Sequence, residues 1–131
     1  MKDVRPAVCS ILKSNPTVFS MVGNGKRIYP VQAPQGEVDP TIVYHRITEG
    51  ADYHMAGFSG LLATRMQIDF WAQRPDLAEQ LALAAEDTMS GFKVPQDGVD
   101  IQGIFVVNGR EDYDGTVSLF RRSHDYEIWY R

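Results

Sequence analysis

The sequence feature that most constrains the fold is a strand followed directly by a helix between residues 60 and 91. From Leu62 to Phe70 apolar and polar residues alternate, and this period of two is typical of a β-strand with one buried face. Apolar residues of 73–91 then recur three and four positions apart, as they do in an amphipathic helix. The sequence therefore predicts a strand over 60–72 that leads into a helix packed back on the sheet.

The other elements have to fit around this pair. Helices are predicted over 3–14 and, as one further turn, over 16–22. Strands are predicted over 27–31, at a sheet edge because of Pro30, and over 41–48, 99–107 and 117–130. Loops or turns are predicted over 32–39, 49–59, 92–98 and 108–115. We therefore expect an α+β fold: a single domain over residues 1–131 with a mostly antiparallel β-sheet and helices packed on one face.

Two predicted segments are unusual in length. The loop over 49–59 is long for a connection between two strands, which is typical of a functional segment. The strand over 117–130 has about 14 residues, or roughly 46 Å at the usual rise. Arg122 and His124 fall on its apolar face between Phe120 and Tyr126. The sequence leaves two interpretations: either this strand bends, or its first half projects and needs another chain to cover it.

Charge and cysteine content exclude several classes of protein. The formal net charge of -4 argues against a general nucleic-acid binder, which needs a basic surface, but it is compatible with a protein that surrounds DNA. A single cysteine, Cys9, excludes an internal disulfide and is expected to act as a small buried hydrophobe. No apolar run is long enough to span a bilayer, and no signal-peptide core is found. We expect a soluble protein without a membrane partner.

No catalytic or metal-binding pattern is found in the sequence. His45, His54 and His124 would have to converge with a carboxylate to hold a metal, and their spacing does not predict this, so surface or pairing histidines are the preferred interpretation. The acidic run that ends at Asp114 lacks the ligand spacing of a calcium loop. We expect no enzymatic activity, no catalytic residue, no metal and no cofactor.

Several stretches, taken in order over essentially the whole chain, resemble the small tail-completion proteins of long-tailed bacteriophages, also described as tail-terminator or head–tail joining proteins. The stretches are Arg27-Ile28-Tyr29-Pro30, Ala33-Pro34-Gln35-Gly36, Pro40-Thr41-Ile42-Val43-Tyr44, Gly57-Phe58-Ser59-Gly60, Arg65-Met66-Gln67-Ile68-Asp69-Phe70-Trp71-Ala72 and the run from Phe120 to Tyr130.

This resemblance implies a structural virion component and no enzyme. It implies a homo-oligomer, usually a hexameric ring, that is assembled in the cytoplasm of the host bacterium. The ring would close the head-proximal end of the tail tube, contact the major tail tube protein and the head connector or stopper protein, and let DNA pass through its lumen without specific binding.

The resemblance also gives a function to the unusual segments. The segment 49–60 is the candidate arm for the tail tube, with Tyr53, His54 and Phe58 as contact residues. The polar face of the central strand and the long last strand are the candidate subunit interface. Its residues would be Arg65, Gln67, Asp69, Arg121 and Trp129.

Two other functions stay open at this point. One is a small α+β enzyme or ligand-binding dimer with a pocket between sheet and helix, because such folds carry many functions. Its mark would be a convergent polar set, for instance His45 meeting His124 and a carboxylate. The other is a head-completion adaptor of similar build.

Overall fold

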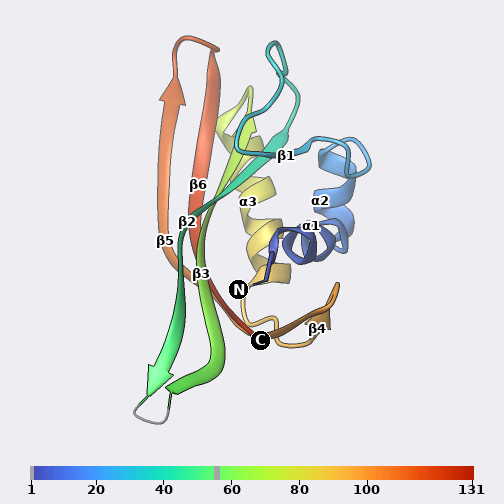
Figure 1. The fold of residues 1–131 in the computed structure, drawn as a ribbon. Helices are drawn as coiled ribbons and strands as arrows, with labels where there is room; N and C mark the ends of the chain where they lie inside the picture. Colours follow the sequence, from blue (N-terminus) through green and yellow to red (C-terminus); the bar gives the residue numbers. More distant parts are fainter. Residues whose placement is uncertain (1, 55–56) are drawn as a thin grey trace.

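A computed structural model describes residues 2–54 and 57–131, with side chains throughout except those of 52–54 and 57–59. Figure 1 shows its elements in chain order. They are α1 (Arg5–Lys13), α2 (Pro16–Met21), β1 (Ile28–Pro30), β2 (Thr41–His54), β3 (Gly57–Ala72), α3 (Pro75–Met89), β4 (Pro95–Gln96), β5 (Val99–Asp114) and β6 (Leu119–Tyr130).

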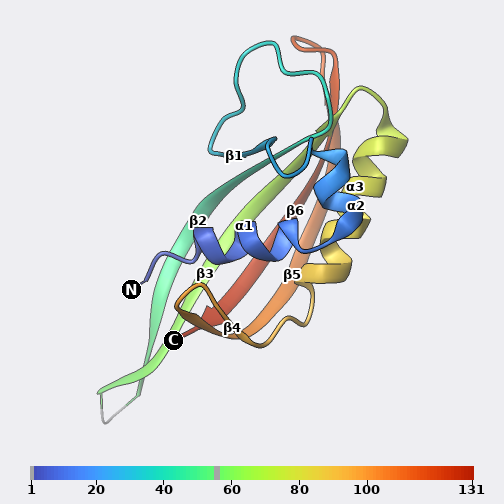
Figure 2. The same cartoon turned by 90° about the vertical axis from the view of Figure 1, so that its right-hand side faces the viewer.

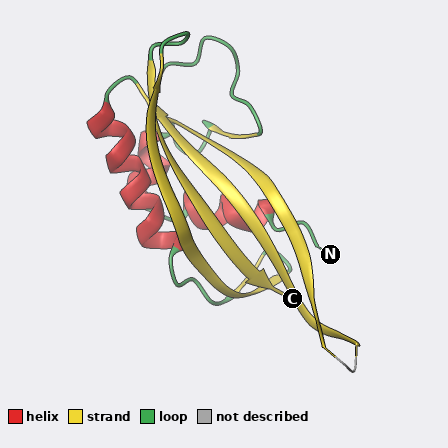
Figure 3. Ribbon diagram, turned by 90° about the vertical axis from the view of Figure 1, so that its left-hand side faces the viewer, coloured by secondary structure: helices red, strands yellow, loops and turns green. Residues whose placement is uncertain are grey.

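The strands form a sheet in the order β1-β2-β3-β6-β5-β4. All neighbouring strands are antiparallel except β1 and β2, which are parallel. The three helices of the described residues lie on one face of the sheet, and none of them covers the other face (Figures 1 to 3). The predicted α+β class, with a mostly antiparallel sheet and helices on one face, is confirmed.

The predicted strand–helix pair is the centre of the core. Met66, Ile68 and Phe70 of β3 are fully buried toward α3, which buries its own stripe of Ala78, Leu81, Ala82, Ala85 and Met89. Each large buried side chain stabilises the fold by about 1.5–3 kcal/mol relative to an exposed one. Helix α3 has a proline in its first turn, where the backbone amides have no hydrogen-bond partner within the helix, so the missing amide of proline costs nothing. The helix is followed by Gly91 at φ +78°, a conformation that glycine adopts easily.

The N-terminal helices extend this core. Val8, Ile11 and Leu12 of α1 are buried, and the half-buried Cys9 packs against the same cluster. Asn15 caps α2, since its side-chain oxygen accepts hydrogen bonds from the amides of residues 17 and 18 at 2.9 and 3.2 Å. Its side-chain nitrogen donates to the carbonyl of residue 84 at 3.0 Å, which ties the cap to α3.

Two predicted loops are strands instead. The prediction of a loop over 49–59 is wrong, because β2 continues to His54 and β3 already begins at Gly57; residues 55–56 lie outside the described residues. The turn predicted over 108–115 is also wrong, because β5 continues to Asp114. Cross-strand pairing with β3 and β6 holds both segments extended, although their Gly, Glu and Asp residues disfavour strands.

The last strand starts later than predicted, at Leu119, and is paired on both sides with β3 and β5. Arg122 faces α3, where its Nε donates to Glu79 at 3.0 Å, and His124 is buried beside Phe70. Helix α3 of the same chain therefore covers both polar residues. At these two positions no covering by another chain is needed.

Candidate functional site

The sheet face opposite the helices, called here the helix-free face, carries most of the polar side chains that the strands present. Strand register places the predicted interface residues on it, since Gln67, Asp69 and Arg121 alternate with the buried residues of β3 and β6. Figure 3 shows that no helix lies over this face. Its main charged and aromatic members are Arg65, Gln67, Asp69, Trp71, Arg110, Asp112, Arg121, Asp125 and Trp129.

In the middle of this face the carboxylate of Asp125 binds two arginines. Asp125 is 4% exposed and accepts hydrogen bonds from Arg65 at 3.3 Å and from Arg110 at 3.2 and 3.4 Å. Burial raises the pKa of Asp125, but the hydrogen bonds from Arg110 and Arg65 outweigh burial, so its pKa lies below the ordinary 3.8. The two guanidinium groups are partly exposed, so each ion pair stabilises the fold by no more than about 1 kcal/mol.

A second set of contacts joins Asp69 to Arg121. One oxygen of Asp69, Oδ1, accepts hydrogen bonds from Gln67 at 2.9 Å and from Ser123 at 2.7 Å, while Arg121 lies 3.9 Å from the other oxygen, Oδ2. Arg121 donates through Nε to Asp112 at 2.8 Å, and its guanidinium lies over the Trp71 ring at 5.2 Å. Three of the predicted interface residues thus share one network.

The other two predicted interface residues lie further along the sheet. Arg65 joins the network around Asp125, and Trp129 is half-buried opposite Gly103 of β5 and Ala63 of β3. All five predicted interface residues are therefore on the helix-free face, on the two inner strands β3 and β6.

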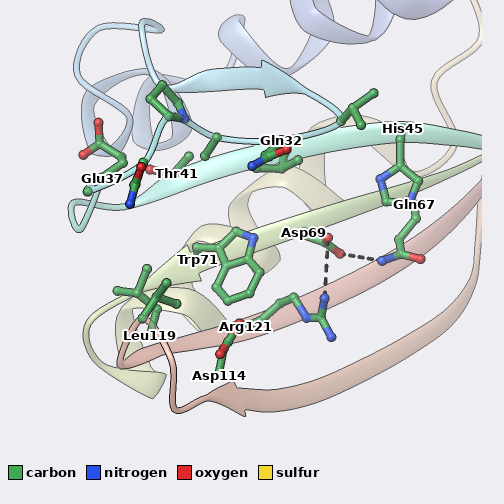
Figure 4. A pocket seen from close by; sticks show the side chains of 17 residues that line it. Gln32, Glu37, Thr41, His45, Gln67, Asp69, Trp71, Asp114, Leu119 and Arg121 are labelled. Carbon is green, nitrogen blue, oxygen red and sulfur yellow. Dashed lines mark hydrogen bonds and ion pairs between the residues drawn. The ribbon is translucent and has the colours of Figure 1, made fainter.

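A pocket of about 690 Å³ opens on the helix-free face at the end of the sheet near the β5–β6 turn (Figure 4). Its floor is built from Val43, His45, Gln67, Asp69 and Trp71. Residues 31–37 form one wall, and Asp114, Val117, Leu119 and Arg121 form the other. The alternative of a small enzyme or ligand-binding dimer predicts a pocket between sheet and helix, whereas this pocket lies on the opposite side of the sheet.

The floor of this pocket contains a polar atom with no bonding partner. The Nδ1 atom of His45 is buried and makes no hydrogen bond to any described residue. A buried polar group left in this state costs about 1–3 kcal/mol. Sequence reasoning missed the pocket, because its walls come from two segments that are far apart in the chain.

The wall of the pocket also contains a strained residue. Val31 has φ +65°, and the amide of Gln32 donates to the carbonyl of Pro30 at 2.7 Å, a tight three-residue turn centred on Val31. A β-branched residue rarely takes this conformation, and such outliers cost about 1–3 kcal/mol each. The Val31 side chain is nevertheless 68% exposed, so the fold gains little from burying it.

Val31→Gly is expected to raise the free energy of unfolding by about 1 kcal/mol, since the relief of strain exceeds the backbone entropy that glycine costs. This corresponds to roughly 3–5 °C in Tm for a domain of this size. Thermal unfolding followed by circular dichroism measures it. Val38→Gly is the matched control, because Val38 is in the same loop, exposed and without a positive φ. It should lose stability, and an equal gain in both variants would contradict the strain argument.

The two histidines whose side chains the structure describes, His45 and His124, lie on opposite faces of the sheet. His45 pairs with Gln67 on the helix-free face, whereas His124 pairs with Ile68 on the helix-covered face, so the sheet separates them. The feature that would mark the enzymatic or ligand-binding alternative, His45 meeting His124, is therefore not present. Among the residues that the structure describes, no group of three or more His, Cys, Asp and Glu could hold a metal ion.

His124 is instead a buried histidine of the core. It is 3% exposed, its ring packs edge-on against Phe70 at 5.5 Å, and its Nδ1 lies 3.2 Å from the hydroxyl of Tyr126. Burial and the nearby charge of Arg122 hold the pKa of His124 below its ordinary 6.5, against the opposing effect of Glu86.

Acidification is therefore expected to destabilise the protein through His124. The unfolded chain takes up a proton at the ordinary histidine pKa, before the folded chain does, so the free energy of unfolding falls as pH drops below about 6.5. The slope cannot exceed about 1.4 kcal/mol per pH unit for one group. Urea unfolding at pH 7.5, 6.5 and 5.5 measures it. His124→Gln should flatten this slope, and an unchanged slope would assign the effect elsewhere.

The predicted tail-tube contact residues lie at the far end of the β2–β3 hairpin. The backbone of Tyr53 pairs with that of Phe58, and the backbone of His54 pairs with that of Gly57. Their side chains lie outside the described residues. The segment is thus the end of an extended hairpin, at the opposite end of the sheet from the β5–β6 turn (Figure 1).

Comparison with known proteins identifies the family. The family model described as tail completion protein gp17 matches residues 6–131. The chain belongs to this family. Tail completion proteins have a structural role in the phage tail, and this chain shares that role.

A solved structure supports the fold of this tail completion protein. A chain in the virion of a native gene transfer agent particle superposes with a TM-score of 0.72 at 14% sequence identity, covering 95% of this chain and 92% of that one. At this identity the similarity concerns the fold. No curated protein sequence matches the chain. None of the described helices combines the length and hydropathy needed to cross a bilayer.

Proposed function

We propose that this tail completion protein forms a homo-oligomeric ring, with six subunits as the family resemblance implies. The ring would close the head-proximal end of a long phage tail, assemble in the bacterial cytoplasm and stay in the finished virion. A purely structural role agrees with a site made of ion pairs, hydrogen bonds and aromatic rings.

The observation that best supports ring formation is that the sheet has an open edge on each side. Strand β1 covers only residues 42–44 of β2, so no strand that the structure describes pairs with residues 45–54 on that side. Strand β4 covers only residues 99 and 100 of β5, and the amide of Gly91 bonds to Ile104, so residues 105–114 are open. Open edges invite pairing with another chain.

The two open edges differ in sequence and run in opposite directions. Strands β2, β3, β6 and β5 alternate in direction, so β5 of one subunit could pair antiparallel with β2 of the next. A repeated contact between two different surfaces generates a ring when the rotation closes. The open stretches lie toward opposite ends of the sheet, and pairing them would tilt the strands to the ring axis, as closed sheets require (Figure 1).

Further contacts are proposed for the surfaces around these edges. The β2–β3 hairpin, with Tyr53, His54 and Phe58 at its end, would reach the major tail tube protein. The predicted interface residues are on inner strands, so a neighbouring subunit reaches them only if it overlaps the helix-free face. A head connector protein would bind the opposite end of the ring. The net charge of -4 suits a lumen through which DNA passes without being held.

The solution mass tests this proposal. Multi-angle light scattering at several concentrations, with negative-stain images of the same samples, should give rings of about six subunits with an open centre, either alone or after addition of tail tubes. A tight dimer that forms no ring under both conditions would overturn the proposal.

A further inference from the structure

We propose that the pocket between residues 31–37 and the β5–β6 turn binds a basic side chain carried by a segment of a partner protein. That the partner is another virion protein rests on the function proposed above. The chemistry of the site itself does not, because it follows from the charges, hydrogen-bonding groups and apolar surface of the pocket.

The charge of the pocket selects a cation. Of the charged side chains that line it, Glu37, Asp69 and Asp114 are acidic and Arg121 is basic. The guanidinium of Arg121 is already engaged by Asp112, which lies just outside the pocket, and it contacts Asp69 at 3.9 Å. The site therefore keeps a surplus of negative charge after its own arginine is paired.

The hydrogen-bonding groups of the pocket floor favour a ligand group that donates hydrogen bonds. The Nδ1 atom of His45 is buried without a partner and is an acceptor when the ring proton is on Nε2. Asp69 uses Oδ1 for the hydrogen bonds from Gln67 and Ser123, while its Oδ2 has no hydrogen bond from a described residue. A lysine ammonium has three donors and no acceptor, so it can donate to acceptors of this kind without leaving an acceptor of its own unpaired.

The apolar surface of the pocket can contact the aliphatic part of a lysine side chain. The ring of Trp71 lies between the wall of residues 31–37 and Arg121, and its position is shown in Figure 4. Lysine buries its aliphatic stem against apolar surface while the ammonium reaches polar groups. At about 690 Å³ the pocket is within the usual range for ligand sites and has room for a side chain and its adjoining backbone.

Fluorine NMR of the full chain tests the proposal with a defined probe. With 5-fluorotryptophan at both tryptophans, Trp71 reports on the pocket, and Trp129 serves as an internal control on the same face. The probes are acetyl-Ala-Lys-Ala-amide and its Glu and Gln counterparts, titrated to 20 mM. The lysine peptide should shift the Trp71 signal saturably, with a Kd in the millimolar range, and leave Trp129 unmoved.

Matched variants locate the binding site. Glu37→Gln with Asp114→Asn keeps the local hydrogen-bond acceptors and should weaken lysine-peptide binding about five- to tenfold. Glu127→Gln removes a charge from the same face outside the pocket and should leave lysine-peptide binding unchanged.

Three outcomes would overturn the proposal. The first is a Trp71 signal that does not respond to the lysine peptide, and the second is a Glu peptide that binds with the same affinity. The third is a Trp71 signal that shifts with protein concentration alone, which would indicate a second copy in the pocket. Since the assay needs no tails, its failure would leave the ring proposal standing.

Discussion

Val107→Lys is expected to abolish ring assembly and leave a folded monomer. Val107 lies at a bulge in the open stretch of β5 and is 44% exposed, so lysine fits the isolated fold without strain. Natural proteins use lysine on edge strands to prevent pairing with other chains, because the buried ammonium would lose its hydration. The mass from light scattering should fall from that of the ring to 14.7 kDa.

The other open edge supplies a matching variant. Ile47 lies at the corresponding bulge of β2 and is also 44% exposed. Ile47→Lys should likewise give a monomer, because each subunit needs both edges. Leu83→Lys is the control, since Leu83 is 50% exposed on α3, away from either edge, and this variant should still form rings.

Mixing the two edge variants separates a head-to-tail contact from a symmetric one. A Val107→Lys subunit keeps an intact β2 edge, and an Ile47→Lys subunit keeps an intact β5 edge. An equimolar mixture should therefore form one-to-one dimers that cannot grow further. If either variant dimerises alone, or if the mixture stays monomeric while the parent protein forms rings, the proposed pairing of β5 with β2 is wrong.

The strand–helix pair could be predicted from sequence because its signals are local. The alternation from Leu62 to Phe70 and the helical spacing that follows fix which side of each element is buried, and Pro75 and Gly91 mark the helix ends. The extended ends of β2 and β5 could not be predicted in this way. Residues 49–54 and 108–114 have weak strand propensity, and only pairing with β3 and β6 makes them strands.

The candidate site was likewise predictable from sequence only in part. Gln67, Asp69 and Arg121 could be placed on one face from alternation alone, and the structure brings them into one network. The pocket could not be foreseen, because its wall depends on Arg27. That side chain donates to the carbonyls of Pro40 and Met21 at 2.9 and 2.8 Å, and so fixes both ends of the intervening segment. Hydrogen bonds from a side chain to such backbone carbonyls leave no periodic pattern in the sequence.

Phe70→Ala is expected to lower the free energy of unfolding by about 3–5 kcal/mol. Phe70 is fully buried between α3 and the sheet and packs against His124, so alanine would leave a cavity that the paired strands cannot close. A loss of this size is a large part of the 5–15 kcal/mol that stabilises a typical domain. Urea unfolding measures it best in the Val107→Lys background, where assembly no longer makes stability depend on concentration.

The neighbouring residue provides the sharpest control for this prediction. Trp71→Ala removes an even larger aromatic ring one position along β3, but that ring is half-buried on the helix-free face, where it lines the pocket. It should cost less than half as much stability as Phe70→Ala. Equal losses would mean that the helix-free face is packed as tightly as the core. The expected unequal losses would show that the two adjacent rings have different roles, with Phe70 required for the fold and Trp71 available to a partner.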